Sequence, residues 1–326
     1  MKATDKIKEL QGIIAARLLP EIKGKKIILL DVPYYSNIGD TLIWQGTHDL
    51  LKSNDIECVQ TSSKDSFDFR QIPADWVILL QGGGNFGDIW AEHQLFREKV
   101  ISSYPDNKII ILPQTIYFAK EENLKRDAEI FSRHNDLLIV ARDEVSFGIL
   151  NKYYGRNRAL LLPDMALCIN FKKFNTTGAN DGRTLFFERQ DKEANPLYVY
   201  NKIIPDNAER HEWPLMEHQD ISWRTKWLYR IKYRLPRYYD AYWNLVMRKY
   251  YIGIGVDFIN RYETVFTTRL HGAILSLLLG KKIVLFDNSY GKNSSFFKTW
   301  LTGVDEIELI EPTVSKPDTI LNISHG

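Results

Sequence analysis

KIILLDVPYYSNIGD, residues Lys26–Asp40, joins a short apolar run to a cluster of turn-forming residues. The run Lys26–Val32 has no regular alternation of polar side chains, which is typical of a strand buried on both faces of a parallel sheet. The turn ends at Gly39-Asp40, and a helical pattern follows from Thr41 to Ser53. The stretch therefore predicts the first strand–turn–helix unit of an α/β domain.

The same alternation of strand and helix patterns continues along the chain. Further strands are expected at Glu57–Gln60, Trp76–Gln81, Lys108–Pro113, Leu137–Ala141, Ala159–Leu162, Thr184–Glu188, Thr264–Thr267 and Lys282–Phe286. Helices are expected at Asp88–Ser103, Glu121–His134, Glu144–Tyr154, Trp243–Tyr262, Leu270–Leu279 and Ser294–Leu301. Phe171–Arg183 has weak periodicity and predicts a linker. We therefore expect an α/β protein with two Rossmann-like βαβ domains facing a cleft, residues 1–175 and 176–326.

Length and composition exclude several classes of protein. The 326 residues suggest about two domains. The 43 Lys and Arg residues against 41 Asp and Glu residues leave a net charge of +2, which argues against a nucleic-acid partner. Cys58 and Cys168 stand outside any CxxC or Cys/His cluster, so we expect no disulfide and no metal site. Met1–Pro20 lacks the apolar core of a signal peptide, and no apolar run is long enough to span a bilayer, so a cytoplasmic protein is expected.

Two turns follow predicted strands of the N-terminal half. Ligands of open α/β sheets bind beside the carboxyl ends of strands. At Asn37–Asp40, Gly39 permits a tight turn and Asp40 can cap the next helix, so the turn is a ligand-binding loop or a simple cap. Gly82–Asp88 satisfies GxGxxG, but the next strand ends without the acidic residue of a dinucleotide site. We interpret these glycines as letting the backbone approach a ligand, the alternative being a tight strand-to-helix turn.

The segment Thr267–Gly272 joins a predicted strand to a predicted helix in the C-terminal half. Helix N-termini hold anions, and Arg269 adds a forked cation suited to carboxylate or phosphate. His271, in the same first turn, can move a proton near neutral pH. The alternative is a structural arginine beside a hydrogen-bonded histidine. The combination favours a functional site.

Two more arginines follow predicted strands. Arg189 lies in the charged run Phe187–Glu193 and would face the same cleft as Arg269, although such a run is also typical of a solvated loop. Arg142 would either point into the cleft or pair with the neighbouring Asp143.

Basic and aromatic residues alternate in Trp223–Tyr251, where Asp240 is the one acidic residue. The cations are Arg224, Lys226, Arg230, Lys232, Arg234, Arg237, Arg248 and Lys249. Cations interleaved with Trp and Tyr are typical of a segment that lies on a membrane surface. A nucleic-acid patch or an ordinary amphipathic helix are the alternatives. We expect Pro236 to break the segment into two helices.

Together these motifs resemble those of the polysaccharide pyruvyltransferases, from Tyr35 to about Leu301. The resemblance rests on Asn37–Asp40, Gly82–Asn85, Leu112–Gln114, Arg142-Asp143, Leu162–Asp164, Arg189 with Asp191–Glu193, and Thr268–Gly272 followed by Leu279–Ile283. The Thr268–Gly272 motif is the most specific of them. Thr268 itself departs from the family, which often has an acidic residue or serine at this position.

The resemblance implies a two-domain fold like that of GT-B glycosyltransferases. It also implies transfer of pyruvate from phosphoenolpyruvate to a sugar, with formation of a ketal, in capsule or exopolysaccharide biosynthesis and without a metal or other cofactor. By the same resemblance, Arg189, Arg269 and His271 are the catalytic residues of the phosphoenolpyruvate site. The implied substrate-binding residues are Asn37, Gly39, Asp40, Gly83, Gly84, Asn85, Gln114, Arg142 and Leu270.

Two other functions remain compatible with the sequence. A GT-B glycosyltransferase would share the fold and use a nucleotide-sugar donor. A membrane-peripheral scaffold would bind lipid and turn over nothing. We expect a lipid-linked sugar acceptor at the inner face of the cell membrane; the sequence leaves open the identity of that sugar and whether it is instead nucleotide-linked.

Overall fold

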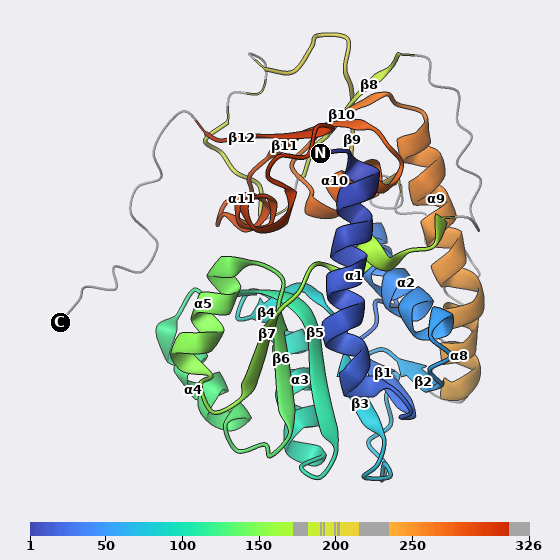
Figure 1. Cartoon of the computed structure of the whole chain (residues 1–326), viewed down its shortest axis with the longest axis vertical. Helices are drawn as coiled ribbons and strands as arrows, with labels where there is room; N and C mark the ends of the chain where they lie inside the picture. Colours follow the sequence, from blue (N-terminus) through green and yellow to red (C-terminus); the bar gives the residue numbers. More distant parts are fainter. Residues whose placement is uncertain are drawn as a thin grey trace, which may run out of the picture.

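The structure, a computed structural model, contains two parallel β-sheets, and helices pack around them. One sheet lies above the other in the view of Figure 1. The structure describes residues 1–171, 182–189, 191, 193–198, 200, 203–214 and 235–312. The first sheet contains β1 (Ile27–Leu30), β2 (Cys58–Ser62), β3 (Val77–Leu80), β4 (Gly83–Gly87), β5 (Lys108–Tyr117), β6 (Leu137–Ala141) and β7 (Arg158–Leu161). The second contains β8 (Thr184–Phe187), β9 (Glu209–His211), β10 (Thr264–Thr267), β11 (Lys282–Phe286) and β12 (Ile307–Ile310). The predicted α/β class, GT-B-like with two parallel sheets, is confirmed.

Helices connect most of the successive strands. In the first half they are α1 (Ala3–Ile22), α2 (Ile38–Ser53), α3 (Ala91–Ser103), α4 (Glu121–Phe131), α5 (Glu144–Tyr153) and the 3₁₀ turn η1 (Met165–Cys168). Later in the chain they are α8 (Pro236–Tyr242), the π-helical turn η4 (Trp243–Met247), α9 (Arg248–Asn260), α10 (Leu270–Leu278), α11 (Lys292–Phe296) and the π-helical turn η5 (Phe297–Leu301). Among the described residues, no helix is both long and apolar enough to cross a membrane.

Each sheet reverses its strand order beside its first strand. The first sheet has the order β2-β1-β3-β5-β6-β7, with β4 beside β5, so the reversal lies between β1 and β3. The second sheet has the order β12-β11-β10-β8-β9, and its reversal lies between β8 and β10. Such a reversal opens a crevice at the carboxyl ends of the two strands, where α/β proteins bind ligands. The fold therefore provides one ligand-binding position on each sheet.

The glycine-rich segment forms a strand, which corrects the predicted loop. Gly83 pairs with Gln114, and Gly87 pairs with Tyr117 of β5. A Cβ atom on Gly87 would lie 1.7 Å from the carbonyl oxygen of Tyr117, and φ is +132° at Gly87. Only glycine fits that close approach, and a strand rich in glycine has no apolar pattern to reveal it.

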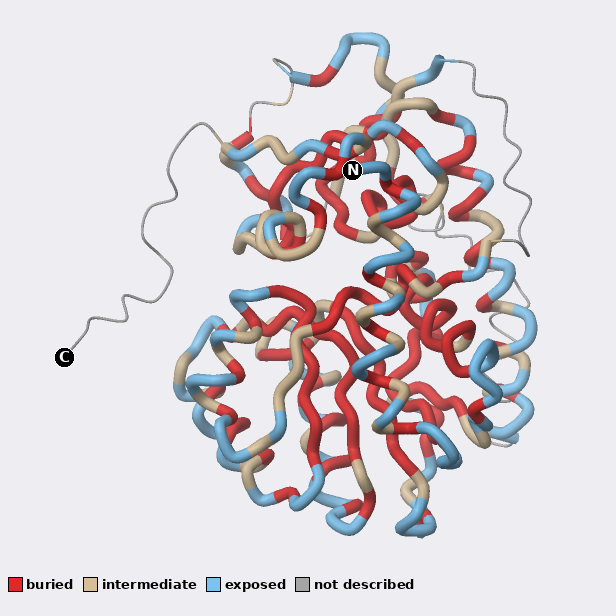
Figure 2. The backbone as a smooth tube through the Cα atoms, viewed as in Figure 1, coloured by how far each residue is buried: buried red, intermediate tan, exposed pale blue. Residues whose placement is uncertain are grey.

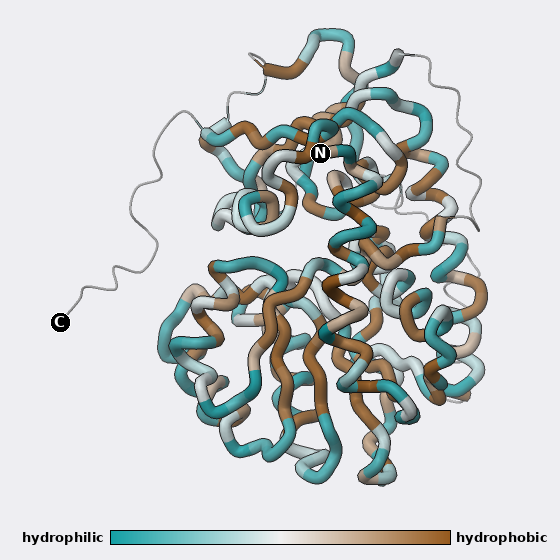
Figure 3. Tube along the Cα trace, viewed as in Figure 1, coloured by the Kyte–Doolittle hydropathy of each residue, from teal (hydrophilic) through white to brown (hydrophobic). Residues whose placement is uncertain are grey.

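The two sheets share one apolar core. A continuous cluster of buried residues includes Leu29 of β1, Leu42 of α2, Ile274 of α10 and Phe187 of β8. Figure 2 shows buried residues concentrated in the strands, and Figure 3 shows that the same strands are the most hydrophobic parts of the chain. The boundary expected between residues 175 and 176 lies outside the described residues.

The described part of the basic and aromatic segment packs one face against the first half and exposes the other. Residues 223–234 lie outside the described part of the chain. The Tyr34 ring stacks on that of Trp243, with 5.0 Å between the centroids. Arg248 is buried and donates a hydrogen bond of 2.5 Å to Oε1 of Gln45. The apolar period of a helix does not distinguish a face that meets another helix from one that meets lipid, so the sequence could not separate them.

Candidate active site

His271 lies where the two halves of the molecule meet. It is the second residue of α10, directly after β10 and Arg269. Its Nε2 lies 3.4 Å from Oδ2 of Asp164, which follows β7 in the first half. A Cβ atom on Gly39 would lie 3.0 Å from Nδ1 of His271, so α2 approaches the imidazole closely because residue 39 has no side chain. The structure thus brings together His271 and Gly39, two predicted site residues.

Arg142 contacts the same carboxylate oxygen of Asp164 as His271 does. Its Nη1 donates to Oδ2 of Asp164 at 2.6 Å, and its Nε donates to Oγ1 of Thr115 at 2.8 Å. Burial alone would raise the pKa of Asp164, but the contacts with His271 and Arg142 hold that pKa well below its usual range. Asp164 therefore stays ionised and lies between the buried Arg142 and His271, the candidate proton donor. Arg142 does not pair with Asp143 through a hydrogen bond or ion pair among the described residues, contrary to one of the two expectations.

Two cations meet over Gly84. Nη2 of Arg142 is buried and has no hydrogen-bond partner among the described residues. A Cβ atom on Gly84 would lie 3.2 Å from that Nη2 and 3.4 Å from Nζ of Lys292. Burial, only partly offset by Glu193, lowers the pKa of Lys292 to about 8. The arrangement places two cationic groups, one with an unpaired donor, against a residue where any side chain would crowd them.

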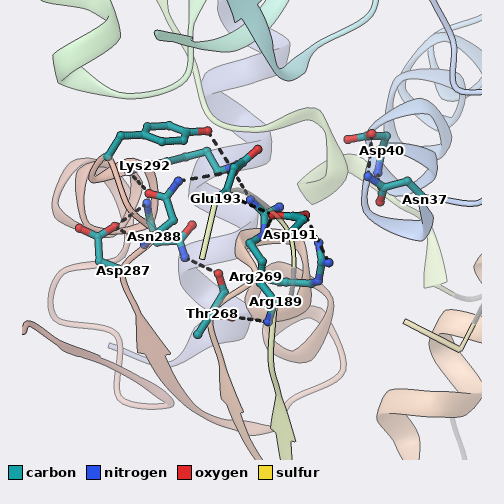
Figure 4. A network of polar contacts seen from close by, with 12 residues as sticks. Asn37, Asp40, Arg189, Asp191, Glu193, Thr268, Arg269, Asp287, Asn288 and Lys292 are labelled. Carbon is teal, nitrogen blue, oxygen red and sulfur yellow. Dashed lines mark hydrogen bonds and ion pairs between the residues drawn. The ribbon is translucent and has the colours of Figure 1, made fainter. Parts of the chain in front are cut away.

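Arg189 belongs to a network of ion pairs around Glu193 (Figure 4). Its Nη1 contacts Oε2 of Glu193, which also accepts from Lys292 at 2.7 Å and from the Tyr290 hydroxyl at 3.0 Å. Burial would raise the pKa of Glu193, but Lys292 and Arg189 lower it far below the usual value. The backbone N–H of Arg189 donates to Oγ1 of Thr268 at 2.8 Å, which ties the ends of β8 and β10 together.

Arg269 is also engaged by carboxylates. Its Nε donates to Oε1 of Glu212 at 2.5 Å, and its Nη2 contacts the second oxygen of the same carboxylate. The carboxylate of Asp191 lies between the two predicted arginines, 3.7 Å from Nη2 of Arg269 and 3.6 Å from Nε of Arg189. Removal of Arg269 would take this ion pair from the buried Glu212, so the arginine also supports the fold.

The start of α2 supplies a second polar cluster. Asn37, not Asp40, is the N-cap, and its side chain accepts from the Asp40 N–H at 3.4 Å. Oδ2 of Asp40 accepts from the Asn37 amide and from the Tyr35 hydroxyl, both at 2.9 Å. Asp40 therefore follows the cap, inside the first helical turn, and is held by two donors.

Of the remaining predicted residues, some make polar contacts with one another and one packs in the apolar core. Nε2 of Gln114 donates to Oδ1 of Asn85 at 3.1 Å, and Asn85 also accepts from Nη2 of Arg97 at 2.8 Å. Gly83 lies in β4, where it pairs with Gln114 of β5. Leu270 is buried in the apolar core, so its side chain packs and contributes no polar group.

Sequence reasoning missed several members of the network. Asp164 and Glu193 stood in the recognised motifs but were not selected as site residues, while Lys292 and Glu212 carried no local pattern. Arginines at the ends of two parallel strands need carboxylates nearby to balance their charge. This need was the one feature of the sequence that could have indicated the missed acidic residues. Among the described residues, no group of three or more His, Cys, Asp or Glu side chains could hold a metal ion.

Comparisons with known proteins agree on one family. A family model described as polysaccharide pyruvyl transferase matches residues 37–290. A Bacillus subtilis (strain 168) protein, EpsO, whose name describes it as a pyruvyl transferase, is 38% identical over 304 residues, which cover 90% of this chain and 91% of that protein. Pyruvyl transferase 1 of Schizosaccharomyces pombe (strain 972 / ATCC 24843) is 26% identical over 324 residues, covering 91% of this chain and 75% of that protein.

A solved structure shares the fold. The crystal structure of the Klebsiella pneumoniae subsp. pneumoniae NTUH-K2044 protein KP1_0663, whose title calls its function uncharacterized, matches with a TM-score of 0.63 and 19% sequence identity. The match covers 92% of this chain and 98% of that one. At this identity the likeness shows the arrangement of the two sheets and nothing about chemistry.

Proposed function

Since the chain belongs to the polysaccharide pyruvyl transferase family and is therefore a transferase, we propose that it transfers pyruvate from phosphoenolpyruvate to a sugar of a polysaccharide precursor. The product is a pyruvate ketal on two hydroxyls of the sugar, made for a capsule or exopolysaccharide. The reaction requires the donor and the acceptor sugar, with no metal or other cofactor.

The observation that carries the donor assignment is the pair of cations over Gly84. Phosphoenolpyruvate has a carboxylate and a phosphate. Both groups form strong hydrogen bonds with a buried guanidinium or ammonium group. Nη2 of Arg142 and Nζ of Lys292 converge on one glycine, and Nη2 has no hydrogen-bond partner among the described residues. Arg189 and Arg269 hold Asp191 between them, and we expect an anionic group of the donor to compete with that carboxylate.

His271 is the proposed acid. Ketal formation adds a proton to the methylene carbon of the donor, bonds one sugar hydroxyl to the central carbon, expels phosphate and then bonds the second hydroxyl. Asp164, fixed by Arg142, orients the His271 imidazole through Nε2. The cations around Glu193 offset the charge that develops on the departing phosphate.

The test is release of phosphate from phosphoenolpyruvate with a panel of galactose- and mannose-type acceptors. Release that depends on the acceptor and continues in EDTA supports the proposal. A parallel measurement compares melting temperatures with phosphoenolpyruvate and with nucleotide-sugars. Stabilisation by a nucleotide-sugar alone would instead indicate a glycosyltransferase.

We further propose that the enzyme contacts an anionic membrane surface, where a lipid-linked acceptor would lie. The outer face of the helix from Pro236 to Asn260 exposes Tyr238, Leu245, Val246 and Tyr250. Arg237 and Lys249 are exposed on the same helix. Apolar side chains beside cations suit the boundary between headgroups and acyl chains, and each Lys or Arg near the surface contributes roughly 1 kcal/mol.

The membrane prediction is checked by co-sedimentation with vesicles of anionic and of neutral lipid. We expect binding to anionic vesicles that falls with salt, because the Debye length is about 8 Å at physiological ionic strength. Leu245→Glu with Val246→Glu should abolish it and leave turnover of a soluble acceptor intact. Equal sedimentation of this variant and the wild type would exclude the proposed face.

A further inference from the structure

A second histidine lies at the strand reversal of the first sheet, whereas Arg189 and Arg269 follow strands of the second sheet. Asp31 directly follows β1, one of the two strands between which the order reverses. His93 is in the first turns of α3, and its Nδ1 lies 2.7 Å from Oδ1 of Asp31. This Asp–His pair occupies the position where the fold of the first sheet provides for a ligand.

The protonation of the pair follows from its partners. An ionised carboxylate only accepts hydrogen bonds, so Nδ1 of His93 carries the hydrogen and Nε2 is left to accept a proton. Burial lowers the pKa of His93, but the charge and hydrogen bond of Asp31 outweigh it and raise the pKa. The other groups that act on His93 are Arg97 of the same helix, which opposes its charge, and Asp40 of α2, which favours it. Glu92, exposed and paired with Lys64, is its charged neighbour in the chain.

Backbone strain marks the same residue. Asp31 has φ of +64°, a left-handed conformation that is uncommon for a residue other than glycine. It is buried, and its Oδ2 has no hydrogen-bond partner among the described residues, with Nη2 of Arg97 3.9 Å away. A strained backbone and a buried polar atom without a hydrogen bond are often found at functional sites.

A ring contact and a hydrogen bond lead from the pair toward His271. The ring of Tyr35 lies edge-on to that of His93, with 6.2 Å between centroids. The Tyr35 hydroxyl donates to Asp40, which is next to Gly39, the residue packed against His271. Trp90, three residues before His93, is 39% exposed and Tyr35 is 38% exposed. Partly exposed aromatic rings beside polar groups suit the mixed apolar and hydroxyl faces of a sugar.

We propose that His93, positioned by Asp31, is the base that takes the proton from the acceptor sugar hydroxyl that attacks the donor. The inference rests on the proposed function. The hydroxyl oxygen bonds to the central carbon of phosphoenolpyruvate while its proton passes to Nε2 of His93 and the methylene carbon receives the proton of His271. The bond between carbon and the phosphate oxygen then breaks, phosphate leaves with the electron pair, and the second hydroxyl closes the ring. The two protons lost by the hydroxyls equal the one gained by carbon and the one that leaves with phosphate.

The experiment compares His93→Gln, Asp31→Asn and a control, Lys99→Gln, further along α3. The substrates are phosphoenolpyruvate and whichever panel sugar gives the fastest phosphate release with the wild type. We expect His93→Gln to lower kcat by ~10²–10⁴-fold and to keep the rise in melting temperature that phosphoenolpyruvate produces. Asp31→Asn should lower kcat and move the acidic limb of its pH profile to lower pH, because the loss of the carboxylate lowers the pKa of His93. Lys99→Gln should behave as the wild type.

Three results would overturn the inference and leave the proposed function in place. Normal kcat in His93→Gln excludes a base, and loss of the donor-induced stabilisation in that variant places His93 in the donor site. An unshifted pH profile in a folded Asp31→Asn variant excludes the Asp–His pair. If His93→Gln does not fold, His93→Asn, whose amide can still donate to Asp31, is measured against the same outcomes. A wild type that releases no phosphate with any acceptor contradicts the proposed function itself, and the base assignment falls with it.

Discussion

His271 meets both halves of the molecule, with Asp164 at one ring nitrogen and Gly39 at the other. We expect His271→Gln to lower kcat by ~10²–10⁴-fold, because glutamine keeps a hydrogen bond but cannot deliver a proton. Phosphoenolpyruvate should still raise the melting temperature of the variant. Steady-state kinetics of phosphate release gives the comparison. Near-normal turnover of His271→Gln would mean that the histidine only positions the substrate.

We expect Lys292 to make donor binding depend on pH. Its pKa is about 8 because burial lowers it from that of an exposed lysine, so the side chain loses its charge as the pH rises through that value. The KM for phosphoenolpyruvate should therefore rise above pH about 8, and Lys292→Arg should move the rise to higher pH, since arginine stays charged. The measurement is KM from pH 7 to 10 with both proteins. A KM that is constant over this range in the wild type would remove Lys292 from the donor site.

At the residue scale, the sequence pointed to cations but not to the carboxylates with which they pair. Arg269 and His271 were selected because a strand end, a helix start and two suitable side chains coincide within six residues. The ion pairs of Arg142 with Asp164 and of Arg269 with Glu212 join residues 22 and 57 positions apart. No local pattern encodes such pairs, because they form only when loops of different strands come together.

At the scale of elements, strands were predicted more closely than the long helix of the C-terminal half. The bounds of β6, β10 and β11 agree with the apolar runs Leu137–Ala141, Thr264–Thr267 and Lys282–Phe286. In the helix, the buried residues Trp243 and Arg248 are five positions apart, across the π-helical turn. A wider turn shifts the buried face by one residue, so a pattern based on 3.6 residues per turn loses register there.

The packing of α2 against η1 depends on Gly46. A Cβ atom at this position would lie 1.8 Å from the carbonyl oxygen of Met165, a backbone atom that cannot move alone. We expect Gly46→Ala to lower the free energy of unfolding by ~1–3 kcal/mol or more, as overpacking does. Gly12→Ala in α1 is the matched control, since nothing lies within 4 Å of its added Cβ atom. That change should be neutral or stabilising by about 0.5–1 kcal/mol. Urea denaturation that shows equal stability of Gly46→Ala and the wild type would contradict the described contact.

At the scale of the whole molecule, two strand reversals face one junction. The reversal between β8 and β10 presents Arg189 and Arg269, and the one between β1 and β3 presents Asp31 with His93. The alternation of strands and helices predicted both sheets, but not the apolar core that α1, α2, α9 and α10 build between them. The relative placement of the sheets depends on which helix faces are buried together, which a single sequence does not specify.

We propose that the pyruvyl group of phosphoenolpyruvate is transferred to sugar hydroxyls at this junction. The most direct measurement is mass spectrometry of the products formed from phosphoenolpyruvate labelled with heavy oxygen in the bridge between carbon and phosphorus. We expect a sugar heavier by one pyruvate less one water, together with inorganic phosphate that carries the label, because the carbon–oxygen bond breaks. Label-free phosphate, or an unmodified sugar beside consumed phosphoenolpyruvate, would contradict it.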